Sequence, residues 1–225
     1  MRFIVKEQRY EKPIAAGRLR YEQDGRATGA VEHWRLTQAV DGYEILRVDL
    51  DARAAASGRS WLYHLVRRAD GRPERLNYRF WGDGREIRGT LLFAERHVTA
   101  TRAVNGETFS EEMELPAGYG FWFPSAVGLG LILDGGVGEI TAVTLNNQTA
   151  GPDTLAARRI NVKRYLAITD QVEAEIAGQL LLVTPWVIFW EENMRFVSLD
   201  EHPWPVKMQR DDGLTAVETR YIWYG

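Results

Sequence analysis

The sequence predicts a mostly β fold: a single curved antiparallel sheet, of the half-barrel or β-roll kind, with one short apolar helix or insert near residues 121–133. One observation behind this prediction is a period-2 alternation of apolar and polar residues, which a strand with one buried face requires. The other is a recurring turn dipeptide that tolerates positive φ at the centre of a hairpin. It occurs at Asp24-Gly25, Asp41-Gly42, Asp70-Gly71, Asp83-Gly84, Asn105-Gly106, Asp134-Gly135 and Asp212-Gly213.

The alternation is clearest between the turns. Leu76, Tyr78 and Phe80 share one parity, while Asn77 and Arg79 take the other. The last segment repeats the pattern over residues 217–223. Residues 61–66, Trp-Leu-Tyr-His-Leu-Val, are instead apolar almost throughout, as in a strand covered on both faces. We therefore expect a second layer over part of the sheet.

The apolar stretch at residues 121–133 is the candidate for that layer. Pro124 lies near a possible helix start, and the stretch ends at an Asp-Gly-Gly breaker. Its two glycines lower helix propensity by about 1 kcal/mol each, so an irregular loop with a single turn is the alternative. A second apolar run, residues 179–190, is broken by Pro185 and predicts two short strands. Residues 171–176 are a further short helical candidate.

Length and composition predict one domain over residues 1–225, since β domains of about 200 to 250 residues are common. There is no cysteine, and the formal net charge of -3 gives no basic footprint for nucleic acid. Residues 1–9 lack the apolar stretch of a secretory signal, and no run is long enough to span a bilayer. The sequence thus predicts a cytoplasmic protein without a membrane span.

The cation balance is unusual, with 24 arginines against 4 lysines. The main interpretation is a compositional bias without function; because arginine binds carboxylates and phosphates through a bidentate fork that lysine lacks, an anion site is the other interpretation.

Catalytic motifs are absent: no phosphate-binding glycine loop and no nucleophile elbow occurs. The histidines show no metal-ligand spacing, so we expect neither a metal nor a cofactor. An uncommon enzyme is the alternative function, in which His202 acts as a general base beside Asp200, or His64 serves as the acid-base residue. An ordinary turn with exposed charges explains the same residues around His202.

The aromatic residues are the remaining functional signal. Their rings suit a concave face that binds an apolar or amphipathic molecule, and they equally suit the filling of a wide core. A third interpretation places them in a homodimer interface. An arginine such as Arg35 or Arg79 could meet a ligand carboxylate. The predicted ligand-binding residues are Trp34, Trp61, Arg79, Trp122, Trp186 and Trp190.

The C-terminal part resembles the closing strands of bacterial spiral β-roll, or half-barrel, proteins, which include lipoprotein-carrier-like and glycolipid-binding families. The resemblance rests on residues 190–193 and 196–200, on residues 205–208, on Asp212-Gly213 and on Tyr221. It implies a curved sheet around an apolar helix, with residues 121–133 in the helix position, and a lipid- or glycolipid-like ligand. Carriers of that kind work outside the cytoplasm, whereas residues 1–9 lack an export signal. No functional residue of these families can be matched individually.

Overall fold

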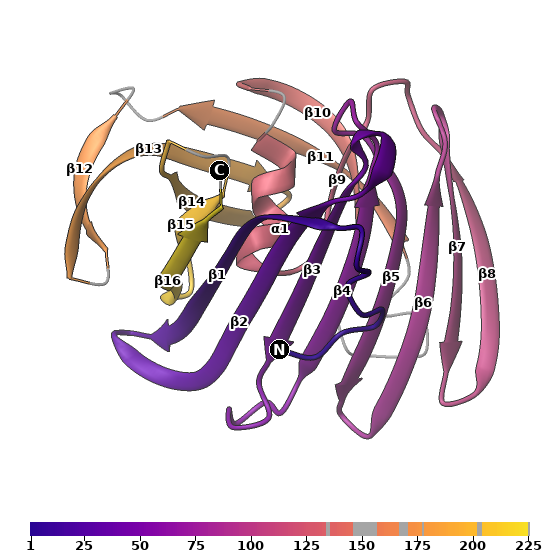
Figure 1. The fold of residues 1–225 in the computed structure, drawn as a ribbon, viewed down its shortest axis with the longest axis horizontal. Coiled ribbons are helices and arrows are strands. Elements are labelled where there is room, and N and C mark those ends of the chain that lie inside the picture. The colour runs from indigo at the N-terminus through magenta and orange to yellow at the C-terminus, as the bar shows by residue number, and fades with distance from the viewer. Residues whose placement is uncertain (134–135, 146–156, 167–170, 177, 202–203, 225) are drawn as a thin grey trace.

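The computed structural model describes residues 1–133, 136–145, 157–166, 171–176, 178–201 and 204–224. Over these residues the chain forms one large sheet of mixed direction that is not closed, together with a single short α-helix (Figure 1). The predicted fold class, a curved sheet with an apolar helix near residues 121–133, is confirmed. No helix among the described residues is long and apolar enough to cross a bilayer.

The first half of the chain is an antiparallel meander. Its strands are β1 (Lys12–Gln23), β2 (Arg26–Gln38), β3 (Glu44–Asp51), β4 (Ser60–Arg67), β5 (Pro73–Gly82), β6 (Arg85–Phe93), β7 (His97–Val104) and β8 (Glu107–Glu114), with a 3-10 turn, η1 (Val40–Gly42), before β3.

The second half supplies the helix and the remaining strands. These are β9 (Gly120–Trp122), α1 (Ala126–Gly130), the 3-10 turn η2 (Leu131–Leu133), β10 (Gly138–Leu145), β11 (Ala157–Leu166), β12 (Val172–Ile176), β13 (Gln179–Trp190), β14 (Asn193–Leu199), β15 (Pro205–Arg210) and β16 (Leu214–Trp223).

The sheet begins and ends at strands that are neighbours in sequence. Its order runs from β8 back to β1, continues through β16, β15, β14, β13, β11 and β10, and ends at β9, while β12 pairs only with β13. Among the described strands, all pairings are antiparallel except that of β9 with β10. The first and last strands of the chain therefore lie side by side within the sheet. Near its ends the sheet curves back on itself, and the Glu111 carboxylate of β8 accepts the backbone N–H of Ala157 on β11 at 2.7 Å.

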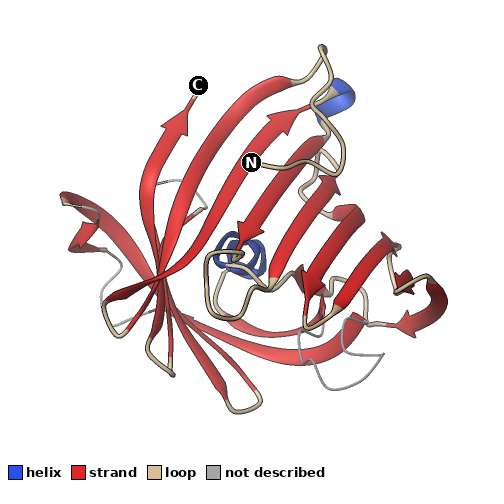
Figure 2. Cartoon of the chain, turned by 90° about the horizontal axis from the view of Figure 1, so that it is seen from below, coloured by secondary structure: helices blue, strands red, loops and turns tan. Residues whose placement is uncertain are grey.

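The helix lies inside the curve of the sheet, as the end view in Figure 2 shows. Every residue of α1 is buried, so an all-apolar segment is what this position requires. Ser125 caps the helix by accepting the N–H of Gly128 at 2.8 Å. A Cβ at Gly128 would lie 2.1 Å from the carbonyl oxygen of Phe123. Although glycine lowers helix propensity, this close approach of the backbone requires a glycine at position 128.

Glu32 on β2 anchors the start of the helix. Its carboxylate is completely buried and accepts the backbone N–H groups of Ala126 and Val127, each at 3.0 Å. The hydroxyl of Tyr21 on β1 donates to the same carboxylate at 2.5 Å. Two of the N–H groups that a helix start leaves unpaired are satisfied in this way. The sheet therefore holds the helix by hydrogen bonds as well as by packing.

The turn signal has the predicted conformation in part: at Asp70-Gly71 and Asp212-Gly213 only the glycine has positive φ. Asp24-Gly25, Asp83-Gly84 and Asn105-Gly106 have positive φ at both positions and join β1 to β2, β5 to β6 and β7 to β8. This is the geometry of two-residue type I′ hairpins. Asp134-Gly135 lies outside the described residues.

Two local predictions are wrong. Within residues 171–176, Val172–Ile176 form strand β12 rather than a helix, because they pair with β13. Residues 179–190 form one strand rather than two. On one side of β13 the partner is β12 up to Val183 and β11 from Trp186 onward. Pro185 falls between these two partners, in a gap of the pairing on that side of β13.

A segment before β1 covers the opposite, convex face of β3. Arg47 on β3 forms a bidentate pair with Glu11 at 2.8 Å, and both side chains are almost completely buried. Arg2 pairs with Asp49 on the same strand at 2.7 Å. The face that carries Arg47 and Asp49 is therefore shielded from solvent, and His64 on the adjacent β4 is buried on it as well.

Candidate functional site

The concave side of the sheet holds a cavity of about 600 Å³ beside the start of α1. Its lining comes from both halves of the chain. The lining residues are Tyr21, Gln23, Thr28, Ala30, Leu50, Ala52, Ala55, Ala56, Ser57, Arg59, Trp61, Trp122, Pro124, Ser125, Leu129, Thr144, Leu145, Arg158, Ile160, Trp190, Glu191, Asn193, Arg195, Met208, Arg210 and Leu214.

Apolar and aromatic side chains form the inner part of the cavity, here called the floor. It consists of Trp61, Trp122, Leu129, Leu145, Ile160, Trp190 and Met208. All of these are buried except Trp190, which is half-buried. The rings of Trp122 and Trp190 meet edge to face with centroids 5.4 Å apart. Strands β9 and β13 bring these two rings together from positions far apart in the sequence.

Turns and polar side chains form the opening, here called the mouth. It consists of Gln23, Ser57, Arg59, Arg158, Glu191, Asn193, Arg195 and Arg210. The β1/β2, β3/β4, β13/β14 and β15/β16 connections lie at one end of the sheet, because successive antiparallel strands turn at alternate ends. Figure 2 views the sheet from this end. The amide of Gln23 donates to the carbonyl of Asp212 at 2.7 Å and joins two of these turns.

Four of the mouth residues are arginines, and among the described lining residues Glu191 is the one carboxylate. Arg158 pairs with Glu191, across the mouth from β11 to the β13/β14 turn. The other three arginines pair with carboxylates that are not part of the lining: Arg59 with Asp83 at 3.0 Å, Arg195 with Asp211 at 3.1 Å, and Arg210 with Asp212. The lining thus carries an excess of positive charge.

Arg195 occupies the innermost position among these cations. Its side chain is only 10 % exposed, against 36 % for Arg210. Its guanidinium lies 5.0 Å from the ring centre of Trp190, where a cation–π contact is favourable. Burial, and then the charge of Arg210, lower the pKa of Arg195. Arg195 therefore connects the mouth to the floor in a place where positive charge is only partly compensated.

The structure places three of the six predicted ligand-binding residues in the cavity lining: Trp61, Trp122 and Trp190. Trp34 and Trp186 are not part of it. Trp34 is buried in the core against Trp204, with ring centroids 5.2 Å apart.

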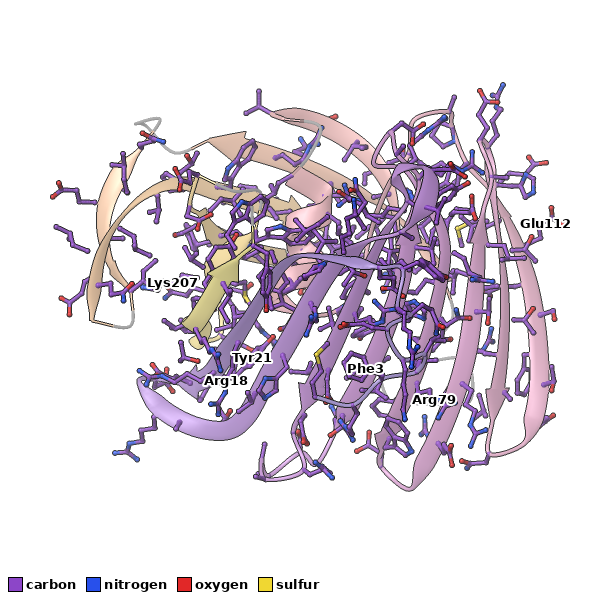
Figure 3. The ribbon with its side chains drawn as sticks, viewed as in Figure 1. Phe3, Arg18, Tyr21, Arg79, Glu112 and Lys207 are labelled. Atoms are coloured by element: carbon purple, nitrogen blue, oxygen red, sulfur yellow. The ribbon has the colours of Figure 1, made fainter. Side chains whose placement is uncertain are left out.

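Neither of the two suggested arginines lines the cavity. Arg79, labelled on β5 in Figure 3, has the parity opposite to the buried Tyr78 and Phe80, so it belongs to the convex face. Arg35 pairs with Glu7 at 2.7 Å.

The described residues do not form a site that would support the alternative function, an enzyme with a histidine as its acid-base residue. His64 is 4 % exposed on the convex face, and its ring nitrogens have no hydrogen-bond partner among the described residues. Burial, followed by the charges of Arg47 and Arg75, lowers its pKa to about 4. Asp200 does not line the cavity, and His202 lies outside the described residues. Within the described ranges, no group of three or more His, Asp or Glu side chains is placed to hold a metal ion.

Sequence reasoning missed the four arginines of the mouth. A signal for two of them exists: Arg210 directly precedes the Asp211-Asp212-Gly213 turn, and Arg59 follows the loop before β4. Both positions lie at the end of the sheet that carries the opening. The fold and the site together define an open, curved β-sheet protein with an internal helix and a cavity beside it. Comparisons with models of known protein families, with curated proteins and with solved structures find no match for this chain.

Proposed function

We propose that the protein binds an apolar or amphipathic small molecule, lipid- or glycolipid-like, in the cavity between the sheet and α1. The observation that carries this proposal is the floor: a cavity of about 600 Å³ lined by Trp61, Trp122 and Trp190. Small-molecule sites commonly measure about 300–1,000 Å³ and combine an apolar lining with a few polar groups. The volume and the lining both meet this description.

The way in which α1 is fixed supports the proposal. Pro124 and Ser125, directly before the helix, line the cavity, and Leu129 of the helix is part of its floor. Because Glu32 holds Ala126 and Val127 by direct hydrogen bonds, the start of the helix cannot move into the cavity without breaking them. A preformed cavity binds a ligand without first ordering the residues around it, which favours affinity.

The resemblance to half-barrel proteins also supports the binding of a lipid- or glycolipid-like molecule. The curved sheet around an apolar helix is the arrangement that this resemblance implies, and its glycolipid-binding members suggest the ligand class. This inference concerns ligand class only.

Extraction of the purified protein with organic solvent, followed by mass spectrometry, tests the proposal. We expect a stoichiometric amphiphile in the extract, or, after extraction and refolding, a rise in melting temperature with monododecanoylglycerol. Ligands that bind only the folded state raise its stability in proportion to the logarithm of their concentration. A clean extract together with an unchanged melting temperature across a panel of neutral, anionic and cationic amphiphiles would contradict ligand binding.

A further inference from the structure

We infer that the ligand is a single-chain amphiphile with an anionic head group, whose chain lies on the tryptophan floor and whose head group binds the arginines of the mouth. This inference rests on the proposed function and specifies the chemistry of its ligand. The head group is defined by what the guanidinium fork binds best: a carboxylate or a phosphate.

The sign of the charge around the cavity is the first argument. The chain as a whole has a formal net charge of -3, whereas the described part of the cavity lining holds four arginines and one glutamate. Charges of one sign in a cleft with apolar walls attract ligands of the opposite sign. The cavity therefore favours an anion although the protein as a whole is acidic.

The arrangement of the ion pairs is the second argument. Asp83, Asp211 and Asp212 bind their arginines without being part of the cavity lining, so they hold the guanidinium groups in place from outside the cavity. A guanidinium has five N–H donors, and one carboxylate engages at most two of them at once. Arg210 binds Asp212 through Nε and Nη2, which leaves its Nη1 group for a second oxyanion.

The contact of Arg195 with Trp190 is the third argument. The guanidinium lies 5.0 Å from the ring centre, so the last cation of the mouth meets the first aromatic ring of the floor. Besides its pair with Asp211, Arg195 donates through Nη1 to the carbonyl of Met194 at 2.6 Å and has a long contact from Nη2 to Asn193 at 3.4 Å. In an amphiphile the apolar chain is joined directly to the polar head group. In the cavity the apolar ring of Trp190 is likewise in direct contact with the charged group of Arg195.

The volume limits the size of the chain. Since a water-sized group takes about 30 Å³, a cavity of about 600 Å³ holds roughly twenty non-hydrogen atoms. A dodecanoate or a dodecyl phosphate fits this limit. A lipid with two long chains exceeds it.

Calorimetric titration with four twelve-carbon probes below their micelle concentrations tests the inference: dodecanoate, dodecyl phosphate, neutral monododecanoylglycerol and cationic dodecyltrimethylammonium. We expect both anions to bind about tenfold tighter than the neutral probe, the difference typical of a charge-assisted contact, and the cation to bind most weakly. Equal affinities for the anionic and neutral probes, or preference for the cation, would overturn the head-group assignment and leave the proposed function standing. Absence of binding by all four would instead remove the proposed function.

Arginine variants locate the head group. Arg210→Gln and Arg158→Gln should each weaken dodecanoate binding about tenfold and weaken monododecanoylglycerol binding by a smaller factor. Arg72→Gln is the matched control, because Arg72 pairs with Asp70 two residues away, as Arg210 does with Asp212, and lies outside the cavity lining. It should change neither affinity. An equal effect of the Arg72 and Arg210 variants on dodecanoate would place the head group elsewhere.

Discussion

The carboxylate of Glu32 accepts the backbone N–H of Ala126 at 3.0 Å, and this bond connects the inner surface of the sheet to the first residue of the helix. Glu32 has the same parity on β2 as Ala30, which lines the cavity, and Trp34, which lies in the core. A buried carboxylate between two such neighbours costs free energy unless it is fully hydrogen-bonded. The backbone N–H groups of α1 provide that compensation, so the position of the helix depends on Glu32.

Replacement of Glu32 by leucine should therefore destabilise the protein by at least about 2 kcal/mol. Two buried N–H donors lose their acceptor, and each unsatisfied donor costs about 1–3 kcal/mol. Glu32→Gln retains one acceptor oxygen and should lie between the wild type and Glu32→Leu. Unfolding in urea measures the difference. Glu22→Gln, on the adjacent strand β1 with a more exposed ion pair, is the control and should change stability little. Wild-type stability of Glu32→Leu would show that the helix needs no such anchor.

Glu218 on β16 should make the protein less stable at alkaline pH. Its side chain is buried, and burial raises its pKa from the ordinary 4.5 to about 8. The unfolded chain releases this proton near pH 4.5 and the folded chain only near pH 8, so stability falls as the pH rises through this window. The loss is on the order of 5 kcal/mol. Unfolding free energies at a series of pH values measure it.

The matched variant is Glu218→Gln, which cannot ionise. Its stability should exceed that of the wild type at pH 9, and the difference between the two should shrink toward pH 4. A constant difference over the whole range would mean that the folded protein does not hold the proton of Glu218.

His64 should make the protein less stable at acidic pH. Its pKa is lowered by burial from 6.5 to about 4, so between these values the unfolded chain binds a proton that the folded chain does not. Stability therefore falls as the pH decreases from 6.5 to 4, by about 3 kcal/mol. Replacement of His64 by glutamine should remove this part of the pH dependence. His97→Gln, at a more exposed histidine, is the matched control. Identical pH profiles for wild type and His64→Gln would contradict the burial of a neutral imidazole.

The parts of the fold that depend on local chemistry could be predicted from the sequence. Asp83-Gly84 adopts the positive φ values that a two-residue hairpin needs, and this follows from the two residues alone. The apolar insert was identifiable for a similar reason, since a helix buried on all sides must be apolar throughout. The error at residues 171–176 shows the limit, because there a pairing with β13 overrides local helical preference.

The candidate site could be predicted only in part. Trp61, Trp122 and Trp190 were found because large aromatic residues mark concave surfaces, but residue type cannot distinguish them from Trp34, which fills the core. The mouth depends on long-range register: Arg158 on β11 meets Glu191 only because β11 and β13 are neighbours in the sheet.

The position of Arg79 outside the cavity could have been predicted from the sequence. Its parity opposite to Tyr78 and Phe80 already assigned it to the other face of β5. The burial of Glu32 could also have been predicted, because its parity places it between Ala30 and Trp34 on the buried face.

The binding of an amphiphile to the tryptophan floor is tested most directly by fluorescence quenching with a monoacylglycerol whose chain carries bromine. Bromine quenches only nearby rings, and three of the eight tryptophans line the cavity. We expect saturable quenching of part of the emission. Trp190→Phe should reduce the quenched fraction, and Trp81→Phe, which removes a ring outside the cavity lining, should increase it. Quenching that is absent, or that changes equally in both variants, would contradict the binding of an amphiphile in this cavity.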